Sequence, residues 1–212
     1  MEYNEDLNIW QAFTDLMSNA FVILLLLLLI TSTKYSILQI SNNRNTGTPP
    51  ILLMKDANYR FTPGSAAIPP LILNYIKNKI ILDIEQTTKD FKINTVEIIG
   101  YTDEQPIGSA TSNLDNNLEA AASSSGSVSN LNAGSNADLG LLRSLAVVKE
   151  LLKIQKQESR MPRVKFRAYL AAQLILPNGE FASISQNQRQ ADATRRRIEI
   201  RFTRFGEVRE VK

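Results

Sequence analysis

The chain has 212 residues, of which 43% are hydrophobic, and a formal net charge of +3. This length and composition suffice for one folded domain of ordinary size with an appendage, and they exclude a disordered chain. Histidine and cysteine are both absent. Their absence excludes histidine acid–base catalysis, cysteine nucleophiles, the usual zinc ligand sets and disulfides. The basic residues are scattered, so no basic block predicts binding to nucleic acid.

A purely apolar run occupies residues 20–30. Alone it is too short for a hydrocarbon layer that needs about 20 helical residues. Extending it to Trp10 and Tyr35 places aromatic side chains at both ends, as in the interfacial belts of membrane helices. We therefore expect a transmembrane helix at residues 10–35, after a short cytoplasmic N-terminus at residues 1–9. A cleaved signal peptide is the weaker alternative, because no basic residue precedes the run and no small-x-small site follows it.

The first half of this helix carries a polar face. At about 100° per residue, four polar side chains lie on one arc: Thr14, Asp15, Ser18 and Asn19. A carboxylate at membrane depth costs at least a few kcal/mol, so an intramembrane Asp normally faces a partner helix and marks an ion path. In the alternative, the helix begins nearer Met17 and Asp15 is an interfacial cap.

Residues 36–50 are polar and end in two prolines, which predicts a linker. Strand and helix patterns then alternate along residues 51–205, where Ile198, Ile200 and Phe202 point one way in the last strand. We expect an α+β domain with helices packed on one sheet, and a tail at residues 206–212.

Ser, Asn, Ala and Gly dominate residues 109–135, which show no clear periodicity. Such a composition supplies few side chains for a packed core. We therefore expect this segment to be a flexible insertion within the domain.

Two parts of the chain resemble known families. Residues 10–17 (WQAFTDLM) resemble the start of the transmembrane helix in MotB-type stator subunits. Residues 51–205 resemble the OmpA-like peptidoglycan-binding domain, through four motifs in the family's order. These are residues 61–66 (FTPGSA), 100–103 (GYTD), 136–143 (NADLGLLR) and 195–200 (RRRIEI). The resemblance implies helices on one mixed sheet.

The resemblance to MotB and ZorB implies the stator of an ion-driven motor. Two copies of the chain, a homodimer, would sit inside five copies of a MotA- or ZorA-like multi-helix subunit. The motor would transport H⁺ or Na⁺, with no cofactor, no bound metal, no catalytic activity and no nucleic acid. Because peptidoglycan lies outside the cytoplasmic membrane, the domain would lie there too. The positive-inside rule points the other way, since Lys34 and Arg44 follow the helix and no basic residue precedes it.

The resemblance also implies a peptidoglycan site, made of Thr102, Asp103, Asn136, Leu139, Arg143 and Arg196. A stem-peptide residue carries an ammonium and a carboxylate, which Asp103 and Arg143 could clamp. Asn136 and the N–H groups at the helix start would add donors. Without the surrounding motifs, a turn after a strand would be the favoured explanation of Asp103, and an exposed helix face that of Arg143.

Two functions from different classes remain open. The first is the motor stator, with Zorya-type anti-phage defence slightly favoured over flagellar rotation because the expected linker is short. The second is a passive tether that binds peptidoglycan and moves no ions. A tether needs no polar face on its membrane helix, so Asp15 favours the motor.

Overall fold

A computed structural model describes residues 3–55, 61–108, 110–123, 126–184, 189–204, 206 and 210, and only the backbone of residues 3–8 and 40–46. Residues 1–2, residues 109, 124 and 125 of the expected insertion, and the expected tail apart from Gly206 and Glu210 lie outside this description. The chain divides into two compact units, Met1–Gly47 and Thr48–Lys212.

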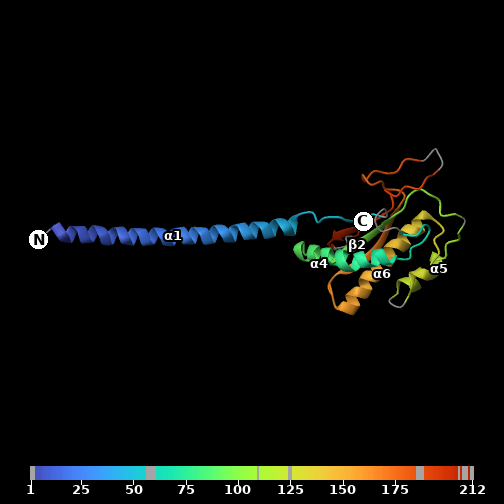
Figure 1. The fold of residues 1–212 in the computed structure, drawn as a ribbon, viewed down its shortest axis with the longest axis horizontal. Helices are drawn as coiled ribbons and strands as arrows, with labels where there is room; N and C mark the ends of the chain where they lie inside the picture. The colour runs from blue at the N-terminus through green and yellow to red at the C-terminus, as the bar shows by residue number, and fades with distance from the viewer. Residues whose placement is uncertain are drawn as a thin grey trace. The chain divides into compact units, whose positions relative to one another are not determined.

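The first unit is one long helix, α1 (Tyr3–Thr46), drawn in blue in Figure 1. It contains neither Gly nor Pro, and it ends where Gly47 and two prolines follow. Its segment Ile9–Gln39 is long and apolar enough to cross a membrane, with a mean hydropathy of 2.3 over its most apolar window. That window is not buried against any described residue, as expected of a surface that meets lipid.

The predicted linker is wrong over residues 36–46, which continue α1 without a break. The segment is polar, but its Ser and Asn residues cost only about 0.7 kcal/mol each in a helix relative to Ala. An existing helix can extend through such residues, because propagation is easier than nucleation. Residues 47–51 are left between α1 and the first strand.

The second unit contains a mixed four-stranded sheet in the order β1-β4-β2-β3. Its strands are β1 (Leu52–Lys55), β2 (Thr95–Tyr101), β3 (Lys165–Ala172) and β4 (Arg197–Thr203). β2 and β3 are parallel, whereas β4 runs antiparallel to both β1 and β2. The α+β class with helices on one mixed sheet is therefore confirmed.

The helices cover one face of this sheet. They are α3 (Pro70–Tyr75), the π-helical turn η1 (Ile76–Ile80), α4 (Ile81–Asp90) and α6 (Asn136–Glu158). Ile198, Ile200 and Phe202 of β4 are buried beneath them in the main core, as their alternation predicts. Ser135 caps α6 by accepting a hydrogen bond from the Asp138 N–H.

A close crossing joins α6 to β2. A Cβ atom added to Gly100 would lie 1.9 Å from the Gly140 carbonyl oxygen, well inside any real contact. Only glycine at position 100 lets the helix backbone approach the strand so closely. The crossing fixes the end of β2 against the start of α6, which Figure 1 shows side by side.

The prediction of a flexible insertion is wrong for its described residues. The segment forms α5 (Leu114–Ala122) and the 3₁₀ turn η2 (Val128–Asn130). It forms a second hydrophobic cluster with α6, made of Leu114, Ala121, Leu131, Ala133, Leu139, Leu142 and Leu145. The segment contains few apolar residues, and many Ser and Asn residues separate them in the sequence. Their helical spacing is therefore hard to recognise.

Leu114→Ala is expected to lower the free energy of unfolding of the fragment Thr48–Lys212 by about 2–3 kcal/mol, because it empties a buried site. Both hydrophobic clusters are built within this fragment, so urea titration can measure the change. Leu82→Ala is the matched control, since Leu82 is 52% exposed. If both substitutions lowered the free energy of unfolding by the same small amount, the segment would be a flexible spacer and not part of the core.

Candidate functional site

The close crossing of β2 and α6 brings most of the expected site residues to one end of the domain. Thr102 and Asp103 directly follow β2, and Asn136 begins α6. The Thr102 hydroxyl donates to the Asn136 carbonyl at 3.5 Å, and the Asn136 amide donates to the Gln105 carbonyl at 2.9 Å. Leu139 is buried in the second cluster, so it supports the site by packing.

Asp103 is buried and is paired with a cation. Its Oδ2 accepts a hydrogen bond from Arg196 Nη1 at 2.6 Å and from the Asp192 N–H at 2.9 Å. Arg143 was expected to form the clamp together with Asp103. In the structure, the arginine that contacts the Asp103 carboxylate is Arg196. The Arg196 side chain is 25% exposed and Asp103 only 7%, so a ligand can reach the pair from the arginine side.

Arg143 is also buried, with 3% of its surface exposed, and the alternative of an exposed helix face is wrong. Its Nε donates to the Ser65 carbonyl at 3.0 Å, and its Nη2 donates to the Thr62 carbonyl at 3.3 Å. The guanidinium lies 4.9 Å from the centre of the Phe61 ring. Arg143 therefore fastens the loop of the FTPGSA motif to α6.

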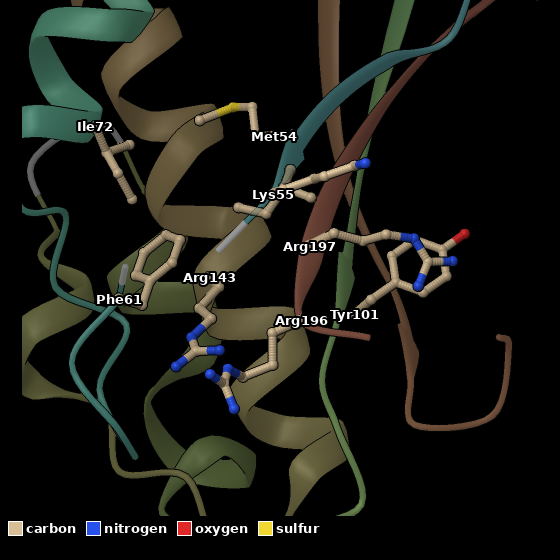
Figure 2. Close-up of a pocket in the computed structure, with 9 residues that line it drawn as sticks. Met54, Lys55, Phe61, Ile72, Tyr101, Arg143, Arg196 and Arg197 are labelled. Atoms are coloured by element: carbon tan, nitrogen blue, oxygen red, sulfur yellow. The ribbon is translucent and has the colours of Figure 1, made fainter. Parts of the chain in front are cut away.

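Figure 2 shows the guanidinium groups of Arg143 and Arg196 pointing toward the same region below Phe61. The pocket behind them is also lined by Lys55 and Arg197, and its volume is about 10 Å³. Such a space holds about one water molecule. A group as large as an amino-acid residue does not fit into this space, whereas the Arg196 side chain of the pair with Asp103 is partly exposed.

A network that the sequence reasoning missed stands beside the site. Arg197 lies 3.6 Å from the centre of the Tyr101 ring, and the Tyr101 hydroxyl donates to Glu199 at 2.8 Å. Glu199 also accepts from Arg197 at 2.9 Å and from Arg201 at 2.6 Å. Burial would raise the pKa of Glu199, but these hydrogen bonds outweigh it and hold the pKa below its usual value. The alternating opposite charges of β4 were the available signal for this pairing.

The polar face of α1 carries the expected ion-path residues. Thr14, Asp15, Ser18 and Asn19 are all exposed in the single chain. The Thr14 hydroxyl donates to the Trp10 carbonyl at 2.8 Å, which satisfies it within the helix. Among the described residues, no group of three or more potential ligands could hold a metal ion.

The chain matches no protein-family model and no curated protein. Its structural neighbours are MotB periplasmic domains and an OmpA-like domain.

The periplasmic domain of Helicobacter pylori MotB is 17% identical, with a TM-score of 0.43 over 75% of this chain and 78% of that one. A MotB-like protein from Desulfovibrio vulgaris is 17% identical, with a TM-score of 0.42 over 73% of this chain and 75% of that one. The OmpA-like domain of FopA1 from Francisella tularensis is 12% identical, with a TM-score of 0.34 over 74% and 75%. These likenesses concern how the chain folds and not what it binds.

Proposed function

We propose that the chain is the ion-conducting, wall-anchored subunit of a membrane motor. The observation that carries the proposal is Asp15, with Thr14, Ser18 and Asn19, on one face of a helix of membrane-spanning length. Lipid cannot satisfy a carboxylate, so this face requires protein or water. In the proposed assembly, two copies of α1 lie inside a ring of five multi-helix partners, and their polar faces complete the path for H⁺ or Na⁺.

The second unit is then the anchor, outside the cytoplasmic membrane. Its outer edge offers an anion and a cation in contact, Asp103 and Arg196, beside the donor-rich start of α6. A zwitterionic stem-peptide residue of peptidoglycan can insert its ammonium and carboxylate into such a pair with charge-assisted hydrogen bonds. The clamp therefore uses Arg196 as its reachable cation, with Arg143 holding the adjacent loop.

The short connection between the two units supports anti-phage defence over flagellar rotation. Residues 47–51 span at most about 17 Å when fully extended. A motor that had to reach a distant wall through this connection would have little slack. A passive tether is the second candidate function, and it leaves the polar face of α1 without a purpose.

Asp103→Asn tests the anchor. We expect it to weaken retention of the fragment Thr48–Lys212 on insoluble peptidoglycan by about tenfold or more, because one member of a charge-assisted pair is lost. Asn still accepts the hydrogen bond from the Asp192 N–H, and thermal unfolding checks that the fold remains. Asp83→Asn, which removes a surface ion pair with Lys79, is the matched control. Unchanged retention of the Asp103 variant would show that the anchor site is misplaced.

A further inference from the structure

A groove of about 1050 Å³ lies along the outer side of α6. α6 contributes one wall, between Ala146 and Gln157, and the end of α5 with the residues of η2 contributes another. Ala66, Ala67 and Ile68 line it as well. The groove therefore depends on the packing of the end of α5 and of η2 beside α6.

Lys149 holds the two walls together. Its ammonium donates to the Ala121 carbonyl at 2.7 Å and to the Ser123 carbonyl at 2.6 Å, at the C-terminal end of α5. A cation at this position also interacts favourably with the helix dipole. The position of α5 relative to α6 is thus fixed by the hydrogen bonds of the Lys149 ammonium as well as by packing.

The floor and rim of the groove differ in chemistry. Leu152, Ile68 and several alanines supply apolar surface, and Ser127 and Ser129 supply hydroxyls. Lys153 and Lys156 form an exposed basic rim one turn apart on α6. Glu150, the acidic residue among those that line the groove, forms an ion pair with Lys153 at 3.9 Å. Lys149 and Lys156 line the groove as well, so its lining carries a net positive charge. The rim therefore favours a ligand with negative charge.

One loop contributes both to the candidate site and to the groove. The loop that receives the hydrogen bonds of Arg143 at Thr62 and Ser65 is the same loop whose next residues, Ala66 to Ile68, line the groove. On α6, Ala146 of the groove lies one turn beyond Arg143. A polymer held at the edge near Asp103 can therefore extend toward the groove.

We propose that the groove binds a second stem-peptide segment of the same wall polymer, next to the residue held at Asp103 and Arg196. This inference rests on the proposed anchoring function. Stem peptides combine small apolar side chains with free carboxylates. The small side chains fit the floor of Ala, Ile and Leu, and the carboxylates fit Lys153 and Lys156. Two linked contacts on one polymer raise the overall affinity through effective concentration.

The test compares the full chain in detergent micelles with its double variant Lys153→Gln/Lys156→Gln. Retention on insoluble peptidoglycan is expected to fall about three- to tenfold, as for two exposed charge contacts, and to become less sensitive to salt. Lys77→Gln/Lys165→Gln is the matched control, because it removes two exposed lysines outside the groove. The affinity of a soluble single stem peptide for the first site should not change in either variant, because the changed lysines lie outside that site.

Four outcomes distinguish the groove proposal from the anchoring function. Equal retention of the groove variant and the wild type would overturn the proposal that the groove binds the wall. Weaker retention of Asp103→Asn in the same assay would still support the anchoring function. An equal loss toward the single stem peptide and the polymer would also overturn the groove proposal, because the lysines would then belong to the first site. Amidating the wall carboxylates should abolish the difference between the groove variant and wild type, and a persisting difference would count against the proposal. Failure of the wild type to bind the wall would instead remove the anchoring function itself.

Discussion

Asp15→Asn is expected to abolish ion conduction while leaving membrane insertion and assembly with the partner subunit intact. A carboxylate can bind an ion, lose its net charge and be recharged on release, whereas an amide cannot. Moving each unit charge through the membrane potential is worth about 2.3 kcal/mol per 100 mV. Asp15→Asn should therefore remove nearly all of the ion flux.

The measurement is ion flux in vesicles that contain the chain together with its multi-helix partner. Asp15→Glu is the matched control, because it keeps a carboxylate on the same helix face and should retain part of the flux. Co-purification of the Asn variant with the partner shows that assembly is unaffected. Full flux through the Asn variant would eliminate the motor and leave the passive tether.

Gly100→Ala is expected to lower the free energy of unfolding of the fragment Thr48–Lys212 by at least about 3 kcal/mol. The added Cβ would lie 1.9 Å from the Gly140 carbonyl oxygen. A backbone atom cannot rotate aside as a side chain can, so α6 must move away from β2. Because this crossing supports Thr102, Asp103 and Asn136, retention on peptidoglycan should fall together with stability.

Gly140→Ala, on the other side of the same crossing, is the matched control. Its Cβ would lie 3.1 Å from the Gly100 carbonyl oxygen, a contact that a shift of a few tenths of an ångström relieves. Alanine also favours a helix interior over glycine by about 1 kcal/mol, so the net change should be small. Urea titration of both variants measures the difference. Similar stabilities would mean that the crossing is looser than the structure shows.

The sequence predicts those parts of the fold that have strong periodicity. The last strand was expected because Ile198, Ile200 and Phe202 alternate, and all three are buried in β4. The two errors, at residues 36–46 and 109–135, share one cause. In both segments Ser and Asn suggest irregular structure, but their helix penalties are small enough for an adjoining helix or a few buried leucines to override.

The places of the candidate site residues in the fold could be predicted from the sequence better than their contacts. Motif order places Asp103 just after a strand and Arg143 in a helix, and the structure brings β2 and α6 together. The order of the motifs does not reveal that the loop at Thr62 and Ser65 contacts Arg143, or that Arg196 pairs with Asp103. Which loop covers which helix depends on tertiary packing, which one sequence does not encode in its local pattern.

The continuation of α1 to Thr46 changes the space that the anchor can search. A flexible connection of residues 36–50 would extend to about 50 Å, whereas residues 47–51 extend to about 17 Å. Because volume scales with the cube of the radius, the accessible volume falls roughly 25-fold, and the effective concentration of wall within reach rises in proportion. In the proposed motor, the anchor can therefore bind only a wall that lies within this short distance of the end of α1.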